Sequence, residues 1–214
     1  MKKWMTGAVA LAAVFVLASL SGCGATGGKT DFDRSTIQVQ KDGKVRATEV
    51  DVLDKGTYSF EELKAMAQET VDDYNGKGNG KVTLESVEML DEGTGSVRMV
   101  LDYDSTADYV SFNTPISNSI VLFYGTVSDA MAAGYSMVDM WEADPSKADP
   151  ELVEKKEIEA MGEKQILITS EKGQVCVPDK IAYVGDDAAL TVDTNQKQAM
   201  LEDSSSGLFY LLLK

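Results

Sequence analysis

Histidine is entirely absent from this sequence of 214 residues, and its absence excludes several kinds of site. Ser-His-Asp and Cys-His catalysis use an imidazole as general base, and the His-Glu-x-x-His proteases use it to hold zinc. The Ser-x-x-Lys and Gly-x-Ser-x-Gly patterns and the glycine-rich phosphate-binding loop are missing as well. We therefore assign no catalytic residue and expect neither nucleophilic nor nucleotide-dependent chemistry.

Basic side chains are also few, because Lys and Arg together number 20 against 35 Asp and Glu. The first 22 residues hold two of the lysines and no acid, so the rest of the chain has 18 basic and 35 acidic side chains, a balance of −17. Such a field repels nucleic acid and anionic lipid headgroups, so we expect no nucleic-acid partner. The excess of acid serves solubility or, alternatively, binds divalent cations or a cationic ligand.

The start of the chain has the pattern of an export signal. Lys2 and Lys3 are followed by a stretch without charged side chains, Trp4 to Gly28, whose apolar centre covers residues 8–17. A short positive segment before an apolar one is typical of a signal peptide. The apolar stretch ends at Leu20-Ser21-Gly22-Cys23, which resembles the lipobox of bacterial lipoproteins at each of its four positions.

The lipobox resemblance implies cleavage between Gly22 and Cys23, with diacylglycerol and an N-acyl lipid attached to Cys23. The alternative is an uncleaved transmembrane anchor over residues 4–22, which is close to the roughly 20 apolar residues that cross a bilayer. Both interpretations place the rest of the chain on the extracytoplasmic face of the cell membrane. We expect the membrane to be a partner through the lipid anchor, and no other cofactor.

The chain has two cysteines. If Cys23 carries lipid, Cys176 has no partner for an intrachain disulfide. Cys176 lies between Val175 and Val177, so we interpret it as a small apolar residue buried in a strand.

Length and composition favour three regions. We predict a signal peptide at residues 1–22, a Gly- and Thr-rich flexible tether at 23–35, and a single extracytoplasmic domain at 36–214. After the signal, 192 residues remain, which is enough for one domain with a sizeable core.

The first ordered segment reads as a β-hairpin. Alternating apolar residues over 36–47 surround a turn that ends at Gly43, and this loop length pairs Val39 with Val45. The alternation then changes phase, which predicts a β-bulge at Thr48 or Glu49.

The clearest helix follows this hairpin. Ser59 and Glu62 have the spacing of a capping box, Tyr58 and Leu63 that of a hydrophobic staple, and Asn75-Gly76 ends the helix. The apolar stripe of this helix contains Phe60, Leu63, Ala67, Val71 and Tyr74.

Strands dominate the remainder. We predict a second hairpin over 81–103, a central strand at 119–124 covered on both faces, and a short helix from Thr126 to Gly134. A longer helix is predicted from Pro150 to about Gly162. Further strands are expected at residues 166–169, 174–177, 180–184, 188–193 and 207–213. The fold class is therefore α+β, mainly antiparallel sheet with two or three helices and a C-terminal β-meander.

The ordered region, including Phe123-Tyr-Gly-Thr126 before the short helix, is similar to uncharacterised lipoproteins of Gram-positive anaerobes. This resemblance implies no particular activity.

Two stretches suggest calcium. Asp102, Asp104 and Asp108 share the parity of one strand face, where their carboxylates could hold a metal, or they are simply the solvated face of an edge strand. The stretch from Asp73 to Thr83 resembles the calcium loop of EF-hand and dockerin modules, but a lysine falls at a ligand position and no glutamate closes it. We interpret this second stretch as a glycine-rich connection.

One apolar cluster is a candidate partner surface. Met137, Met140 and Trp141 lie close together in the sequence beside acidic residues. If exposed they form a partner patch, and if buried they belong to an ordinary strand.

These observations favour a noncatalytic binding domain for an unknown protein, glycan or cell-wall ligand. The alternative is a carboxylate-based hydrolase acting on envelope or external polysaccharide, which needs only two correctly separated acids. A small solute-binding lipoprotein is a third possibility.

Overall fold

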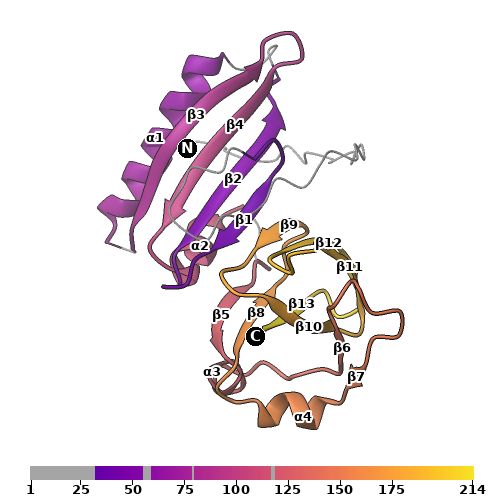
Figure 1. Cartoon of the computed structure of the whole chain (residues 1–214). Helices are drawn as coiled ribbons and strands as arrows, with labels where there is room; N and C mark the ends of the chain where they lie inside the picture. The colour runs from indigo at the N-terminus through magenta and orange to yellow at the C-terminus, as the bar shows by residue number, and fades with distance from the viewer. Residues whose placement is uncertain (1–31, 55–58, 79, 117–118) are drawn as a thin grey trace.

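The structure is a computed structural model, and it describes residues 32–54, 59–78, 80–116 and 119–214 (Figure 1). The expected signal peptide, Cys23 and Tyr58 of the expected staple lie outside these residues. Within them, no helix combines the length and the apolar character needed to cross a membrane.

Four helices and thirteen strands make up the described residues. In chain order they are β1 (Thr36–Val39), β2 (Val45–Val52), α1 (Phe60–Gly76), β3 (Val82–Asp91), β4 (Ser96–Tyr103), α2 (Thr106–Asn113), β5 (Leu122–Thr126), α3 (Val127–Ala132), β6 (Met140–Glu142), β7 (Leu152–Val153), α4 (Lys155–Ala160), β8 (Gln165–Thr169), β9 (Gly173–Cys176), β10 (Ile181–Gly185), β11 (Ala188–Val192), β12 (Gln198–Ser204) and β13 (Phe209–Leu213).

The strands form two open sheets. A seven-stranded sheet has the order β11-β12-β9-β1-β2-β4-β3, and a six-stranded sheet has the order β5-β8-β13-β10-β6-β7. The β1–β9 pair is parallel, and the other pairs described are antiparallel. The class is therefore the expected α+β with mainly antiparallel sheet, although the described residues contain four helices instead of two or three.

The first hairpin has the predicted register, but the predicted bulge is wrong. Val39 pairs with Val45, and Gly43 of the turn has a φ of 83°, a conformation that glycine adopts without strain. The pairing of β2 with β4 then runs from Val45 to Val52 without a register shift. Glu49 consequently lies on the same face of the sheet as Val45 and Ala47. The alternation of apolar residues along β2 changes phase because Thr48, the residue before Glu49, is buried on the opposite face of the sheet.

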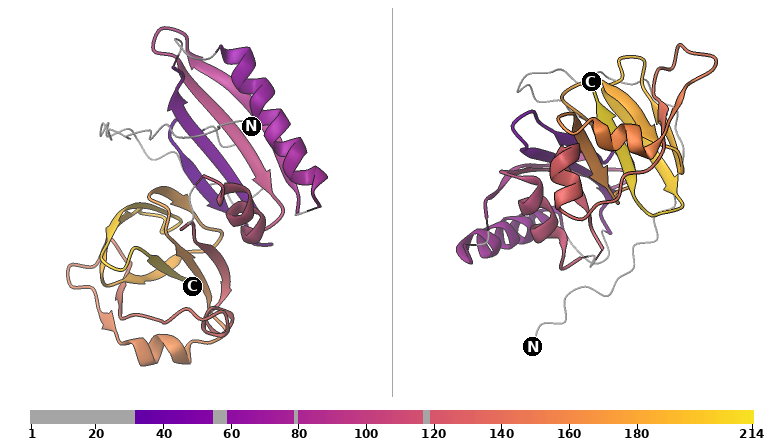
Figure 2. Two further views of the ribbon diagram at one scale, coloured as in Figure 1. Left: turned by 180° about the vertical axis from the view of Figure 1, so that it is seen from behind. Right: turned by 90° about the horizontal axis from the view of Figure 1, so that it is seen from below.

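Helix α1 confirms the capping box. The Glu62 amide donates to Ser59 Oγ at 3.2 Å, and the Ser59 amide donates to Glu62 Oε2 at 2.8 Å. The predicted stripe faces the protein, with Val71 and Tyr74 buried and the others half-buried. Figure 2 shows α1 lying along one face of the sheet beside β3.

In the six-stranded sheet, the continuous apolar runs are buried on both faces. Leu167 of β8 and Leu211 of β13 face one cluster, whereas Ile166, Ile168 and Leu212 face another. Strand β13 confirms the strand predicted at 207–213, and it lies inside the sheet between β8 and β10.

Strand β5, in contrast, is not the central strand predicted at 119–124. It is the first strand in the order of its sheet, and its residues after Leu122 are half-buried. Its apolar residues still touch both clusters, because Tyr124 packs against one and Phe123 against the other. An apolar run alone does not distinguish such a covered edge strand from a central one.

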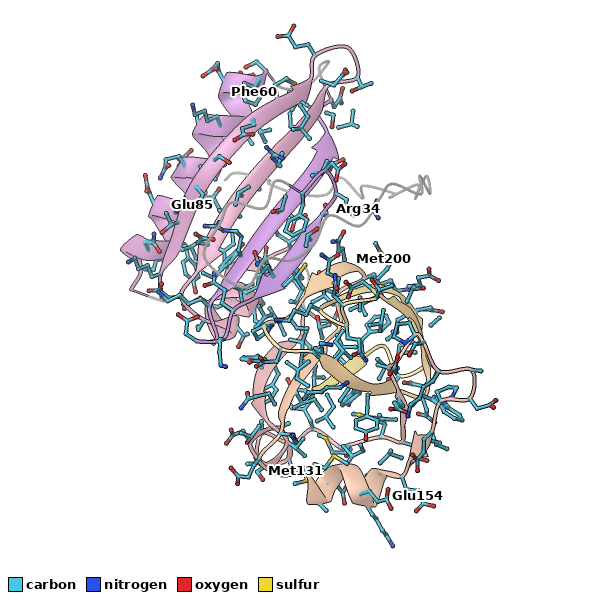
Figure 3. The ribbon with its side chains drawn as sticks, in the orientation of Figure 1. Arg34, Phe60, Glu85, Met131, Glu154 and Met200 are labelled. Carbon is cyan, nitrogen blue, oxygen red and sulfur yellow. The ribbon has the colours of Figure 1, made fainter. Side chains whose placement is uncertain are left out.

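The larger of the two clusters joins both halves of the molecule. It contains Val45 and Leu101 from the part of the seven-stranded sheet near α1, and also Val175, Ile181 and Leu211 from the C-terminal half. The smaller cluster lies under α3 and α4 and includes Val127, Met140 and Ile158. In Figure 3, Phe60 at the start of α1 and Glu154 before α4 lie towards opposite ends of the molecule.

The C-terminal strands are divided between the two sheets. Strands β8, β10 and β13 belong to one sheet, and β9, β11 and β12 to the other. The consecutive strands β11 and β12 pair as a hairpin, whereas β10 pairs with β13 and β6.

The predicted helix from Pro150 to Gly162 is wrong in its first part. Helix α4 begins only at Lys155, because Leu152 and Val153 form strand β7 against Trp141 and Met140. Val153 is buried there, and this contact outweighs the helical preference of the acidic residues around it.

Phe32, the first residue that the structure describes, already packs into the fold, although the tether was predicted to extend to residue 35. Phe32 is buried, and its carbonyl accepts a 3.3 Å hydrogen bond from Arg98 Nη1. Ser35 Oγ accepts from the Val50 amide at 3.0 Å. Residues 32–35 are thus held against the first sheet.

Candidate functional site

The three aspartates proposed for calcium do not form a row. Asp102 is held by Arg46, whose Nε and Nη2 donate to its two carboxylate oxygens at 2.6 and 2.5 Å. Asp104 lies 3.7 Å from Lys44 Nζ. Each carboxylate is therefore engaged by a cation of the neighbouring strand β2 or the turn before it.

Asp108 lies in helix α2, which the sequence analysis missed. Ser105 caps this helix by accepting a 3.0 Å hydrogen bond from the Asp108 amide, and its hydroxyl donates to Asp108 Oδ2 at 2.7 Å. The Ser-x-x-Asp spacing was a signal for a helix start. In the part of the chain that the structure describes, no three His, Cys, Asp or Glu side chains gather to hold a metal ion.

The candidate partner patch is mostly buried. Met137 and Met140 are only 2% and 0% exposed, because they fill the cluster under α3 and α4. Trp141 remains 39% exposed and pairs across the strands with Leu152, which is 42% exposed. The prediction of an exposed patch of all three residues is therefore wrong. The exposed apolar surface here consists of Trp141 and Leu152.

Cys176 is buried in β9, as expected, but it is not a free thiol. It takes part in a disulfide, so the expectation of an unpaired cysteine is wrong. The chain's other cysteine is Cys23, which lies outside the described residues.

A small hollow lies beside β9, β11 and β12. Its volume is about 50 Å³, and its lining is formed by Gln174, Thr191, Asp193, Gln198, Ala199 and Met200. Gln174 Nε2 donates to Gln198 Oε1 at 3.1 Å inside the sheet, so these amides satisfy each other. The volume suits one or two water molecules, and it is well below the roughly 300 Å³ of an ordinary ligand pocket.

Three further polar side chains, from segments far apart in the sequence, influence one another electrostatically. Glu49 comes from β2, Tyr109 from α2, and Glu171 from the loop between β8 and β9. The charges of both glutamates act on the Tyr109 hydroxyl, and the charge of Glu171 acts on Glu49. We call these three residues the Glu49 site.

The pKa values of both carboxylates of the Glu49 site are raised. Burial by the surrounding protein raises the pKa of Glu49 to about 7, and the charges of Glu171 and Asp51 raise it further, while the Ser35 hydroxyl lowers it. Burial also raises the pKa of Glu171. Glu49 nevertheless reaches solvent with its side chain. It is therefore a carboxyl that a ligand can reach and that exchanges its proton near neutral pH.

Neither glutamate has a basic partner among the described residues. Their side chains form none of the ion pairs there, although other acids on the same sheet, such as Asp102 and Glu88, are paired with arginines. Those arginines lie on the opposite face from Glu49, because Arg46 and Arg98 alternate with Ala47 and Met99 along their strands. The Glu49 site is thus negatively charged without compensation.

Tyr109 is the most buried member of the site. Its side chain is 4% exposed, and its ring packs edge-on against Tyr103 with 5.2 Å between the ring centres. Tyr103 packs in the same way against Phe112 at 5.7 Å. Burial, together with the charges of Glu171 and Glu49, raises the pKa of the Tyr109 hydroxyl.

The predicted bulge in β2 is the reason why Glu49 was not a candidate residue in the sequence. Glu49 was explained by a bulge that would have kept it off the apolar face. Without a bulge, every second side chain of β2 lies on the same face of the sheet, so Glu49 shares a face with Val45 and Ala47. An acid on an apolar face is a signal of function.

Three arrangements of the site are chemically useful. Two carboxylates can bind a cation, one protonated and one ionised carboxyl can act as acid and base, and the phenol can donate or accept a hydrogen bond.

Comparisons with models of protein families, with curated proteins and with solved structures find nothing that matches this chain.

Proposed function

We propose that the chain is a lipid-anchored protein on the extracytoplasmic face of a cell membrane, and that its single folded domain binds a ligand without catalysis. The observation that carries the anchor is the sequence from Met1 to Cys23, with its positive start, apolar centre and lipobox. The ligand is a protein, glycan or cell-wall component.

The anchor follows from the chemistry of the lipobox. A diacylglycerol on Cys23 buries two acyl chains, and each buried methylene contributes about 0.8 kcal/mol, which makes the attachment lasting. Cys23 is nine residues before Phe32, the first residue that the structure describes, so the distance between these two residues is at most roughly 30 Å. The domain would therefore stay close to the membrane surface.

Metabolic labelling with palmitate tests the anchor. We expect label on the wild-type protein, none on Cys23→Ser, and undiminished label on the control Cys176→Ser. The lipid on Cys23 and the disulfide of Cys176 exclude each other within one chain, because the chain has two cysteines and a thioether and a disulfide cannot share one sulfur. The intact mass before and after reduction shows which of them is present. Label retained on Cys23→Ser, or an unlabelled chain with Cys23 and Cys176 crosslinked, would overturn the proposal.

The Glu49 site favours a second candidate, a carboxylate-based hydrolase of envelope or external polysaccharide. Such an enzyme needs one protonated acid and one carboxylate. Glu49, whose pKa burial raises to about 7, is the candidate acid, and Glu171, whose charge acts on Glu49, is the candidate carboxylate. Release of reducing sugar ends from cell-envelope polysaccharide, lost in both Glu49→Gln and Glu171→Gln, would support this candidate.

A further inference from the structure

We infer that the free edge of strand β11 binds an extended, basic segment of a partner protein, which joins the seven-stranded sheet as an additional strand. This inference rests on the proposed binding function and names the class of its ligand, a protein instead of a glycan. Strand β11 is one end of its sheet and pairs with β12 alone.

The first argument is that β11 has unused backbone hydrogen-bonding groups. The Asp193 amide donates to the Gln198 carbonyl at 2.9 Å, so the backbone groups of Asp193 point towards β12. Because this direction alternates along an antiparallel strand, Leu190 and Val192 turn their N–H and C=O groups away from β12. No backbone hydrogen bond among the described residues uses these outward groups. A further strand can therefore pair with them.

The second argument is that β11 lacks the protection of the other sheet edges. Strand β3 carries three acidic side chains and two register shifts, and α1 lies beside it. Strand β5 packs against α2 and α3, and β7 has only two residues. Strand β11 has five residues without a charged side chain or a proline, and among the described strands it alone has no buried residue. An unprotected edge of this kind is a place where another chain pairs.

The third argument is charge, which selects the partner. Residues 185–204, from the end of β10 to the end of β12, contain one basic side chain, Lys197, and five acidic ones, which are Asp186, Asp187, Asp193, Glu202 and Asp203. Lys197 Nζ donates to the Pro178 carbonyl at 2.8 Å, and within the described part of the chain only Asp203 of these acids forms an ion pair, with Lys172. A basic strand is therefore attracted to β11. A second copy of this chain is repelled, because it brings the same five acids to the edge.

The hollow beside β9, β11 and β12 offers a place for one side chain of the added strand. Thr191 lines the hollow and is exposed, and it pairs with Met200 of β12, which lines the hollow as well. A strand next to β11 would place one of its side chains beside Thr191 on the same face of the sheet. A volume of about 50 Å³ suits a methyl group better than an aromatic ring, so valine or threonine is favoured there.

Isothermal titration calorimetry on the full chain in detergent micelles tests the inference with three peptides. The strand peptide is the acetylated amide of Lys-Val-Thr-Val-Lys-Val-Thr-Val-Lys. The methylated peptide has methyl groups on four consecutive central amides, so it keeps every charge but loses donors on both of its edges. The acidic peptide has Glu in place of each Lys. We expect the strand peptide to bind, the methylated peptide to bind about tenfold more weakly or worse, and the acidic peptide not to bind.

Matched variants separate the edge from the general acidity of the chain. Thr191→Lys introduces a charge of the kind that prevents edge pairing, and it should weaken binding of the strand peptide about tenfold. Thr191→Gln, of similar size but uncharged, should change the affinity less than twofold. Val192→Pro removes an outward N–H and should weaken binding about tenfold relative to Val192→Ala. The control Glu69→Gln removes an exposed charge of α1 and should change the affinity less than twofold.

Hydrogen exchange of single amides, read by mass spectrometry, shows where the strand peptide lies. We expect the bound peptide to slow exchange of the Leu190 and Val192 amides, because these point outward and become hydrogen-bonded. The Thr191 amide, which faces β12, and the amides of β3 should exchange as before. A peptide held by charge alone would slow none of them.

The inference is overturned if the methylated peptide binds as well as the strand peptide, if Thr191→Lys loses no more affinity than Thr191→Gln, if the protected amides lie outside β11, or if no peptide binds. A concentration-dependent dimer in sedimentation that Thr191→Lys abolishes would also overturn it, in favour of a second copy. A glycan or cell-wall ligand that binds without slowing exchange in β11 would overturn the inference and leave the proposed binding function in place. None of these results affects palmitate labelling of Cys23, so failure of the partner and failure of the anchor are separate observations.

Discussion

Glu49 is an acidic residue on the same face of β2 as the core residues Val45 and Ala47. On β2 it follows Val45 and Ala47 on the face that forms the core, where a carboxylate is unfavourable unless something compensates its charge. No basic side chain among the described residues does so for Glu49. The protein therefore keeps a destabilising group, which is common at binding sites and rare elsewhere.

Substituting Glu49 tests this cost through its pH dependence. The pKa of Glu49 is about 7 in the folded protein, against an ordinary value of 4.5. Between these values the folded state binds more protons than the unfolded state, so the contribution of Glu49 to stability is present below about pH 4.5 and is lost as the pH rises through 7. We expect Glu49→Gln to raise the Tm relative to wild type at pH 8 and to leave it unchanged at pH 4, measured by thermal unfolding. The control Glu69→Gln makes the same change at an exposed position of α1 and measures the effect of removing one negative charge. A Glu49→Gln variant that is less stable than wild type at pH 8 would contradict the raised pKa.

Among the elements, those with strong local signals were predictable. The capping box of Ser59 and Glu62 and the turn at Gly43 act over a few residues, and both appear where the sequence places them. Strand β7 and helix α2 were missed, because a two-residue strand depends on its partner β6 and α2 follows directly on a strand. Glu49, Tyr109 and Glu171 come from segments far apart in the sequence, so no local pattern could bring them together.

The connection between α1 and β3 depends on Gly80. A Cβ at this position would collide with the Asp108 carboxylate, lying 2.7 Å from its Cγ and 3.2 Å from Tyr74 Oη, and the φ of 150° is strained for other residues. We expect Gly80→Ala to lower the free energy of unfolding by about 2 kcal/mol or more, measured by urea denaturation.

Two glycines nearby serve as controls. Gly78 has a φ of 69°, but a Cβ there would meet open space, so Gly78→Ala should show the backbone strain alone. Gly76→Ala, inside the helix and without contacts, should be neutral or slightly stabilising. Equal effects of Gly80→Ala and Gly78→Ala would show that the collision with Asp108 is relieved.

At the scale of the whole molecule, the two halves share one sheet and one core. The parallel pair β1–β9 joins strands more than a hundred residues apart, with Ile37 opposite Val175. Such a pairing has no sequence signal, since a parallel neighbour can come from any part of the chain. This is why the strands were predictable and their order was not.

This continuity predicts that the protein unfolds in one transition. Val175 is 2% exposed in the shared core, paired with Ile37 on one side and Ala199 on the other. Val175→Ala should lower the free energy of unfolding by roughly 2 kcal/mol through lost burial and the cavity left behind.

The chain from Gly24 onward contains every described residue and has Trp141 as its only tryptophan, so its fluorescence reports the C-terminal half. Far-UV circular dichroism at the helix band reports α1, the longest helix described, in the other half. Both signals should shift together to lower urea in Val175→Ala, while Val52→Ala, the same change at a 61% exposed position, should leave both in place. Separate transitions for the two signals would mean that the halves are independent domains, and the Glu49 site between them would then open when only one half unfolds.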